Sequence, residues 1–252
     1  MTIDYPAAGQ VPRLKDLWKK AFGDTDEFLD PFFEIAYAPD CCRCITLDGH
    51  TAAALYWFDS FCEGQRFAYV YAVATDPDYQ HRGLCRTLME DTAQLLKNRG
   101  YDGILLYPAS HGLSRMYEKM GYRRCTAVRE FHCEAGRNAA AMRRIDTAEY
   151  ARLRRRYLPE GGVVQEGAML DFFATQADFW AGENWLAAAS DYDGEFHCCE
   201  LLGDVSAAPG ILKALGRDRG FFRTTGNDKP FAMVRILSEN CKIPAYFGLA
   251  LD

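Results

Sequence analysis

A glycine-containing turn ahead of an amphipathic segment is the stretch of this sequence best suited to chemistry. The turn includes Gln80 and Gly83, and residues 84–98 follow it with apolar side chains at helical spacing. The first turn of a helix presents backbone N–H groups without helical partners, at the positive end of the helix dipole. Gly83 lets a ligand approach the main chain closely. The turn therefore predicts a binding site for phosphate groups.

The segments on either side of the turn are expected to hold it in place. Residues 69–75 are apolar and rich in Val and Tyr, which indicates a buried strand. Pro77 ends this strand because proline lacks an N–H and has a fixed φ angle. Gly100 is expected to end the long helix. A strand at residues 101–107 and a short helix at 113–120 follow.

The turn resembles the acetyl-CoA loop of the GNAT N-acetyltransferases, whose pattern is Q/R-x-x-G-x-G/A. Gln80, Gly83 and Cys85 occupy its fixed positions, and Cys85 stands where the family usually has Gly or Ala. The resemblance covers the first half of the chain and points to two-part bacterial proteins, including the enhanced-intracellular-survival group. It implies the GNAT fold, an α/β (α+β) mixed central sheet flanked by helices, and acetyl-CoA as the acyl donor.

The resemblance also implies how the donor is held. The pantetheine arm would lie where the two parallel strands splay apart, beside the backbone of the first strand. The pyrophosphate would be held chiefly by main-chain groups of the loop. Arg82 and Arg86 either add charge, since arginine suits phosphate, or belong to a solvated first turn. The residues implied in donor binding are Val73, Ala74, Thr75, Gln80, His81, Arg82, Gly83, Leu84, Cys85, Arg86 and Ser110.

Tyr117 is the candidate catalytic acid. It lies in MYEKMGY, residues 116–122, which matches the family's Y-x-K/R-x-G-Y/F pattern. In the family this hydroxyl reaches the CoA sulfur. A phenol with a pKa of about 10 can protonate a thiolate whose conjugate acid has a pKa near 8.5. The alternative is a tyrosine packed on a helix face with its hydroxyl in water. Backbone N–H groups around Val73–Thr75 would stabilise the oxyanion.

The general base is left open. Some family members carry a Glu on the strand before the loop, and the corresponding position here is Tyr71. A water chain, His111, a carboxylate of the second domain or the C-terminus remain alternatives, and the family's C-terminal role is not assigned to Asp252. In GNAT folds the first two helices border the acceptor. Their carboxylates either face a cationic acceptor or are simply solvated: Asp26, Glu27 and Glu34.

Composition sets outer bounds on the function. The net charge of −6 and the pI near 5.5 weigh against nucleic acid or an anionic membrane as partner. No apolar run is long enough to span a membrane, and residues 1–10 do not form a signal peptide, so we expect a cytoplasmic protein. The resemblance implies a bacterial one. The ten cysteines are expected to be reduced and mostly structural. The Cys41–Cys44 spacing lacks the second pair that a zinc site needs, so no metal is expected.

The chain is expected to form two domains, residues 1–136 and residues 137–252. The first would contain an edge strand around Ile3, helices beginning at Pro12 and Thr25, and a strand hairpin turning at Asp48-Gly49. Its strands are predicted at 41–47, 51–58, 66–75, 101–107 and 122–133.

The second domain is predicted to be a degenerate GNAT-like domain without a cofactor loop. Asp146, with Glu149 three residues later, predicts the start of a helix. A second helix is expected at residues 168–180, and a third at 207–215. Its strands are predicted at 141–145, 185–190, 196–202, 221–225, 231–237 and 246–251, with a turn at 191–194.

The segment Glu-Phe-His-Cys occurs twice, at residues 130–133 and 195–198. Two His-Cys pairs would suit zinc. A strand explains them equally well, with Phe and Cys on one face and Glu and His on the other. That division separates each His from its own Cys and argues against a shared metal.

The sequence thus predicts an acetyl-CoA-dependent N-acetyltransferase of class EC 2.3.1.-, acting by direct transfer in a ternary complex. The acceptor would be a small-molecule amine or a peptide amine, and self-association into a homo-oligomer stays open. One alternative is a non-catalytic module that senses acyl-CoA. Another is a thiol-based redox or metal protein.

Overall fold

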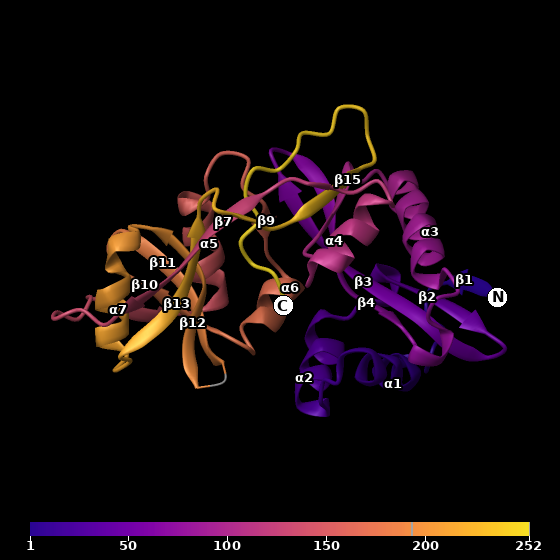
Figure 1. Ribbon diagram of the computed structural model, residues 1–252, viewed down its shortest axis with the longest axis horizontal. Coiled ribbons are helices and arrows are strands. Elements are labelled where there is room, and N and C mark those ends of the chain that lie inside the picture. Colours follow the sequence, from indigo (N-terminus) through magenta and orange to yellow (C-terminus); the bar gives the residue numbers. More distant parts are fainter. Residues whose placement is uncertain (193, 252) are drawn as a thin grey trace. The chain divides into compact units, whose positions relative to one another are not determined.

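The structure is a computed structural model that describes residues 1–192 and 194–251. Asp193, in the turn expected at 191–194, and Asp252 lie outside the described residues. The chain forms two compact units (Figure 1). The first comprises Met1–Arg123 and Met233–Lys242, and the second comprises Arg124–Ala232 and the residues from Ile243 onward.

The first unit is built on a mixed sheet with the strand order β1-β2-β3-β4-β5-β15-β6. Neighbours from β1 to β4 are antiparallel, β4 and β5 are parallel, and β15 is antiparallel to β5. Its strands are β1 (Thr2–Asp4), β2 (Cys42–Leu47), β3 (His50–Cys62), β4 (Gln65–Thr75), β5 (Gly103–Leu106), β6 (Arg123–Arg124) and β15 (Met233–Ile236).

Helices cover both faces of this sheet. In Figure 1, α3 lies on one side of β3 and β4, and α1 and α2 lie on the other. Buried residues of α3 such as Leu88 and Leu96 pack against Leu55 and Ile104 of the sheet. The helices are α1 (Val11–Phe22), α2 (Asp26–Pro31) with a π-helical turn (Phe32–Ala36), α3 (Leu84–Asn98) and α4 (His111–Glu118), with 3-10 turns at Pro39–Cys41 and Pro77–Tyr79.

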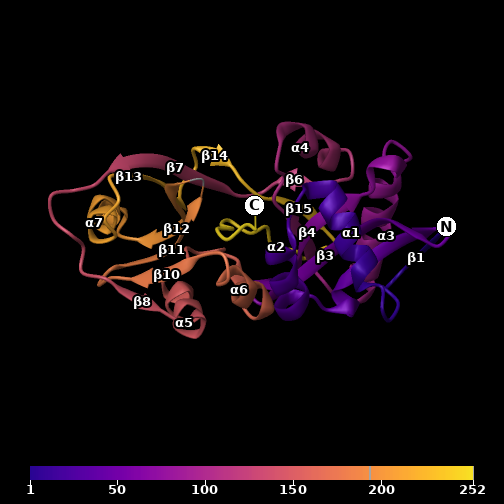
Figure 2. The same ribbon diagram turned by 90° about the horizontal axis from the view of Figure 1, so that it is seen from below.

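The second unit has a mixed sheet with the order β14-β7-β13-β12-β11-β10-β8, and α5 and α7 lie on its opposite faces (Figure 2). The strands of this sheet are β7 (Ala127–Glu134), β8 (Arg143–Ile145), β10 (Asp178–Ala181), β11 (Trp185–Tyr192), β12 (Glu195–Gly203), β13 (Arg219–Thr225) and β14 (Lys229–Pro230). The short strand β9 (Val164–Gln165) is not part of this sheet. The unit's helices are α5 (Thr147–Tyr157), α6 (Ala168–Phe173) and α7 (Ala208–Ala214), with a 3-10 turn at Val205–Ala207.

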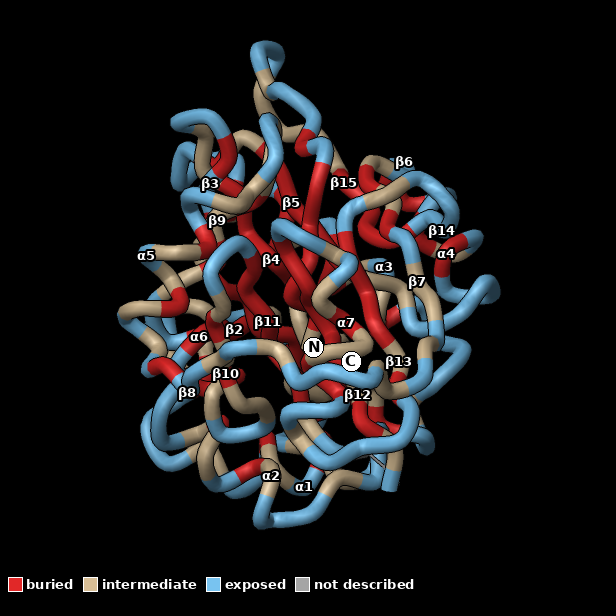
Figure 3. Tube along the Cα trace, turned by 90° about the vertical axis from the view of Figure 1, so that its left-hand side faces the viewer, coloured by how far each residue is buried: buried red, intermediate tan, exposed pale blue. Residues whose placement is uncertain are grey.

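The two sheets share one topology. The order β1-β2-β3-β4-β5-β15 corresponds to β8-β10-β11-β12-β13-β7, and only β4–β5 and β12–β13 within these series are parallel. A helix connects each parallel pair, α3 in the first unit and α7 in the second. The predicted fold class, a mixed sheet flanked by helices with a second sheet of the same kind, is confirmed. Buried residues concentrate in the strands, such as β4, β5 and β13, and the loops are largely exposed (Figure 3).

The units depart from the expected division at residue 136. Residues 127–134 form β7, which pairs with β13 of the second sheet, whereas β15 pairs with β5 of the first. The strand expected at 122–133 is therefore two strands in different sheets, β6 and β7, and the one expected at 231–237 is limited to β15 of the first sheet. Pairing between strands so distant in sequence departs from the usual preference for sequential neighbours, so local patterns do not reveal it.

Two further elements differ from expectation. The helix predicted at 168–180 ends at Phe173, and Trp180 belongs to β10. The Thr175 hydroxyl bonds to the Phe172 carbonyl at 2.8 Å, a side-chain contact that competes with a continuing helix. Residues 246–251 form no strand beyond one bridge between Gly162 and Tyr246. The amide of Gln165 bonds to both backbone groups of Leu249, in place of a strand partner.

Candidate functional site

The edge of β4 that faces β5 is open over its last residues. Parallel pairing with β5 ends at Tyr69–Leu105, although β4 continues to Thr75. Backbone groups beyond that point are not used in this pairing. An extended ligand can bind such an edge by forming main-chain hydrogen bonds, as an added strand does. The predicted pantetheine contacts, Val73, Ala74 and Thr75, all lie in this segment.

A β-bulge interrupts β4 within the same segment. Tyr71 pairs with Tyr56 and Ala74 pairs with Ala54, so two residues of β4 stand opposite the single residue between them on β3. Ala72 has a φ angle of 48°, which is uncommon for a residue with a side chain. The bulge turns the backbone of Ala72 and Val73 out of the ladder. Such backbone distortions cluster at functional sites.

The predicted phosphate loop follows β4 and ends at the start of α3. Gly83 is the N-cap residue of α3, with a φ angle of 78° and no side-chain capping bond. A Cβ atom built on Gly83 would meet no other atom within 4 Å. The requirement for glycine is therefore conformational, and the space in front of the turn is open. The first backbone N–H groups of α3 are available to an anion there.

The side chains of the loop divide into outward and inward groups. Gln80, His81, Arg82 and Arg86 are exposed, whereas Leu84 is buried and Cys85 is half-buried against the α3 core. Leu84 and Cys85 can therefore contribute only backbone groups to a ligand in front of the turn. Burial raises the pKa of the Cys85 thiol, so this cysteine is not poised as a thiolate.

The two loop arginines already contact backbone carbonyls. Arg82 Nη2 donates to the Asp78 carbonyl at 3.1 Å, and its guanidinium lies 5.0 Å from the centre of the Tyr79 ring. Arg86 Nη1 donates to the Lys119 carbonyl at 3.4 Å. Both side chains remain exposed, so either can turn toward an anion at small cost.

Ser110 has a structural role at the start of α4. Its hydroxyl oxygen accepts a hydrogen bond from the Leu113 N–H at 3.2 Å, which caps the helix. His111 is the first residue of α4 and is exposed. The cofactor contact expected at Ser110 stays a prediction.

Tyr117 lies on the buried face of α4. Its side chain packs into the α3 core, and its ring meets Tyr122 edge-on with the centroids 5.6 Å apart. Burial, reinforced by the nearby Cys85, raises the pKa of Tyr117 well above its usual value. Among the described residues its hydroxyl makes no hydrogen bond. Tyr117 is therefore a neutral phenol whose hydroxyl can still receive or donate a bond to a ligand.

The face of β4 opposite α3 is aromatic next to the bulge. The Tyr71 ring lies 5.5 Å from Trp18, 5.9 Å from Phe32 and 6.0 Å from Phe58, measured between centroids. The sequence analysis did not predict this aromatic cluster. The alternation of aromatic residues along β3 and along β4 is the sequence signal that indicates it.

The acidic residues expected to border the acceptor are exposed. Asp26 forms an ion pair with Lys19 at 2.6 Å, and the lysine lowers the pKa of Asp26. Glu27 and Glu34 are exposed. These positions fit solvated helix faces.

Asp76 is a buried charge that sequence reasoning overlooked. Burial alone would raise the pKa of Asp76, but hydrogen bonds from Lys20, the Asp78 N–H and His50 lower it to about 2. Asp76 directly precedes the loop, in the run Asp76-Pro77-Asp78. An aspartate before a proline-initiated turn is a recognisable capping signal.

The described part of the second unit lacks the open strand edge and the open helix start at the corresponding position. Pairing of β12 with β13 continues to Leu201–Thr224, with a bulge at Cys199 opposite β11. The strand leads through a 3-10 turn directly into α7, and Pro209 removes one N–H from its first turn. This unit therefore has neither the open strand edge nor the open helix start of the first unit.

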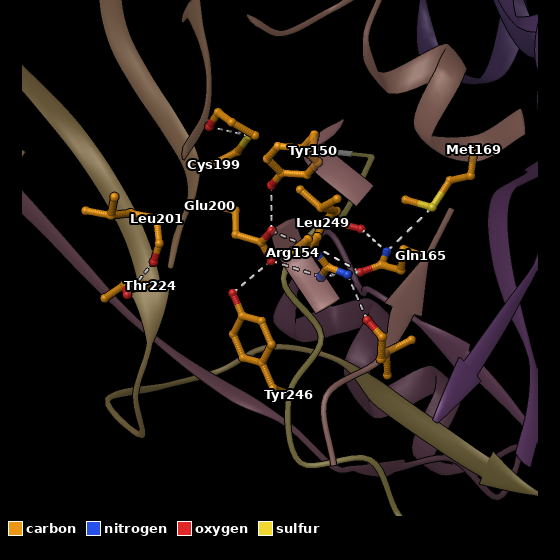
Figure 4. Close-up of polar contacts among 12 residues, drawn as sticks. Tyr150, Arg154, Gln165, Met169, Cys199, Glu200, Leu201, Thr224, Tyr246 and Leu249 are labelled. Atoms are coloured by element: carbon orange, nitrogen blue, oxygen red, sulfur yellow. Dashed lines mark hydrogen bonds and ion pairs between the residues drawn. The ribbon is translucent and has the colours of Figure 1, made fainter. Parts of the chain in front are cut away.

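A buried ion pair lies beside that bulge (Figure 4). Glu200 and Arg154 are 0% and 2% exposed, and Arg154 Nε donates to Glu200 Oε2 at 2.7 Å. The hydroxyls of Tyr150 and Tyr246 donate to the same carboxylate at 2.7 and 3.0 Å. Gln165 accepts from Arg154 and bonds to Leu249, so the network joins α5 and β12 to the last residues described. The side chains of this network hydrogen-bond to one another and to nearby backbone carbonyls.

The repeated Glu-Phe-His-Cys segments lie on both sides of β13. His132 and His197 pack against Phe221, with centroids at 5.4 and 4.4 Å, whereas Phe131 and Phe196 pack against Phe222 on the other face. The predicted division of faces is confirmed. Over residues 1–192 and 194–251, no group of His, Cys, Asp and Glu is arranged to hold a metal ion, and no two cysteines form a disulfide. No helix in those ranges is long and apolar enough to cross a membrane.

Comparison with known proteins agrees with this geometry. The sequence profile of the Acetyltransferase (GNAT) family matches residues 11–122, the range that contains the loop and Tyr117. No curated protein matches the chain at a significant level.

Solved structures share the fold over nearly the whole chain. A GCN5-related N-acetyltransferase from Kribbella flavida is 16% identical with a TM-score of 0.70, over 93% of this chain and 70% of that one. Another from Anabaena variabilis ATCC 29413 is 13% identical with a TM-score of 0.73, over 94% and 73%. A probable N-acyltransferase from Enterococcus faecalis V583 is 17% identical with a TM-score of 0.70, over 94% and 72%. At these identities the likeness establishes the fold alone.

Proposed function

Because residues 11–122 match the GNAT acetyltransferase family and the chain has that fold, we propose that this protein transfers an acetyl group from acetyl-CoA to a primary amine. The acceptor is a small molecule or a peptide, and transfer is direct within a ternary complex. The observation that carries the proposal is the open edge of β4 immediately before an open helix start at Gly83. A CoA molecule, with an extended pantetheine arm followed by phosphates, matches this order of an open strand edge and an open helix start.

The residues of the first unit fit a CoA thioester in two places. Backbone groups of Val73, Ala74 and Thr75 bind the amide-containing arm along the β4 edge. Backbone N–H groups from His81 to Arg86 bind the pyrophosphate, with Arg82 and Arg86 adding positive charge at the rim. Gln80 precedes this turn and is exposed beside it.

Acyl transfer needs stabilisation of an oxyanion and a proton for the leaving thiolate. The bulge at Ala72–Val73 turns backbone groups out of the ladder, and an N–H there stabilises the oxyanion. Tyr117 supplies the proton: burial keeps its phenol neutral, and its hydroxyl is not engaged by the described residues. The new bond forms between amine nitrogen and acyl carbon as the carbon–sulfur bond breaks. The nitrogen then loses its extra proton to solvent, and Tyr117 regains one from solvent.

The amine must arrive without its proton. The strand β4 carries no carboxylate, and Tyr71 occupies the place where a base would stand. We propose that the acceptor loses its proton to solvent before transfer, so the amine's own pKa governs the rate.

Acceptor-dependent release of CoA tests this function. Purified protein is mixed with acetyl-CoA and a panel of arylalkylamines, polyamines, amino acids and peptides, and free thiol is recorded. The proposal expects at least one amine to raise thiol release above the hydrolytic background, with the acetylated product seen by mass spectrometry.

The absence of a carboxylate from β4 also favours a second function, an acyl-CoA sensor without turnover. Acetyl-CoA binding without acceptor-dependent release across the whole panel would support the sensor and refute the transferase.

A further inference from the structure

Asp76 is a buried carboxylate held by three donors. Its side chain is 2% exposed, and Oδ2 accepts from Lys20 Nζ at 2.9 Å and lies 2.9 Å from His50 Nε2. Oδ1 accepts from the Asp78 N–H at 3.0 Å. A buried charge is costly unless its hydrogen bonds are satisfied, and here both oxygens are used. This arrangement specifies one position for the carboxylate.

The donors come from separate elements. Lys20 lies in the last turn of α1, His50 begins β3, and Asp78 lies in the 3-10 turn that leads to the loop. The Asp76 backbone adds two bonds, from its N–H to the Ala52 carbonyl at 2.9 Å and from the Tyr79 N–H to its own carbonyl at 2.8 Å. Asp76 therefore fixes the start of residues 77–83 against the rest of the first unit.

Contacts continue from Asp76 along the loop. The Tyr79 ring stacks on His50 with centroids 5.1 Å apart and an angle of 17°. The Arg82 guanidinium lies over the Tyr79 ring, 5.0 Å from its centre, and Arg82 directly precedes Gly83. The chain of contacts thus ends at the residue before the helix start.

We propose that Asp76 is a positioning residue for donor binding, holding residues 77–83 so that the first N–H groups of α3 face the pyrophosphate. The inference rests on the proposed function, because it assumes that the loop binds CoA. Asp76 itself does not touch the donor. It acts through the loop, so its effect is confined to ligands that carry the pyrophosphate.

Two acyl donors separate this role from a general effect on folding. Acetyl-CoA contains the pyrophosphate and S-acetylpantetheine does not. Asp76→Asn keeps an oxygen for the Asp78 N–H but removes the charge that Lys20 and His50 face. We expect KM for acetyl-CoA to rise about tenfold, the value of one charge-assisted hydrogen bond, with kcat little changed. We expect kcat/KM for S-acetylpantetheine to be unchanged.

The chain offers a matched control and an intermediate variant. Asp78→Asn removes an exposed charge from the same turn and should leave both donors unaffected. His50→Gln should raise KM for acetyl-CoA by less than Asp76→Asn, since Lys20 and the Asp78 N–H remain. Equal losses with both donors, or an unchanged KM for acetyl-CoA, would overturn the inference.

CoA affinity measured by calorimetry gives a readout that needs no turnover. Weaker CoA binding by Asp76→Asn, with an unchanged Asp78→Asn, supports the inference even if no acceptor is found and the transferase proposal fails. Unchanged CoA binding by Asp76→Asn refutes it while leaving the transferase standing. A wild type that binds no CoA refutes both.

Discussion

Tyr117 combines a buried ring with a hydroxyl that the described residues leave available. That combination keeps the phenol neutral and lets it face a ligand, which is what an acid for a thiolate leaving group requires. Ser110 shows the opposite outcome, because its hydroxyl is used in capping α4. A polar side chain is therefore a stronger candidate for a functional role when its polar group makes no hydrogen bond within the described part of the chain.

Removing the Tyr117 hydroxyl tests the acid directly. We expect Tyr117→Phe to lower kcat by about 100-fold or more, the usual contribution of a positioned acid, with acetyl-CoA affinity little changed. Steady-state kinetics with a responsive amine measure the effect. Ser110→Ala is a comparison from the same helix, and a loss of kcat there equal to that of Tyr117→Phe would argue against a specific role for the phenol.

The pH dependence follows from the same residue. A raised pKa means that Tyr117 keeps its proton until pH exceeds that raised value, whereas the acceptor amine loses its proton as pH rises. We therefore expect kcat/KM for the amine to climb from pH 6 toward pH 9 without a falling limb. A pH–rate profile that declines below pH 9 would show that another group supplies the proton.

Most elements of the first unit follow from local signals. Pro12 and Gly23 frame α1, Asp48-Gly49 forms the tight turn between β2 and β3, and Gly83 starts α3 as predicted. The bulge at Ala72 and the exchange of β7 and β15 between sheets were not predictable. The exchange depends on pairing with strands distant in sequence, whereas the bulge lies in the β3–β4 hairpin, and neither leaves a pattern in its own segment.

In the second unit, the Arg154–Glu200 ion pair joins α5 to β12, together with the hydrogen bond from Tyr150 to the same carboxylate. We expect Arg154→Met to reduce the free energy of unfolding by about 3–5 kcal/mol, because it leaves a buried carboxylate without its cation. Arg155→Met is the control, since Arg155 is the next residue on α5 and pairs with Glu166 at the surface. Denaturant unfolding measures both, and similar losses would mean that the buried pair has no special importance.

Taken whole, the molecule repeats one topology and has the proposed donor site in the first unit. The first unit has the open β4 edge and the glycine start of α3, whereas the second has a closed β12–β13 pair and a buried ion pair beside its bulge. The absence of a Q/R-x-x-G-x-G/A pattern from the second half was visible in the sequence. The closure of its strands was visible only in three dimensions. We therefore expect one acetyl-CoA per chain.

Calorimetric titration of acetyl-CoA into the wild type and Gly83→Glu tests this account most directly. The introduced carboxylate opposes the pyrophosphate and strains a φ angle of 78°. Gly100→Glu is the matched control, because Gly100 has the same φ angle and equally open surroundings at the other end of α3.

We expect one site in the wild type and in Gly100→Glu. In Gly83→Glu we expect the affinity to fall by about 100-fold or more, as loss of two charge-assisted hydrogen bonds implies. Failure of the folded wild type to bind, or equal binding by Gly83→Glu, would contradict this account.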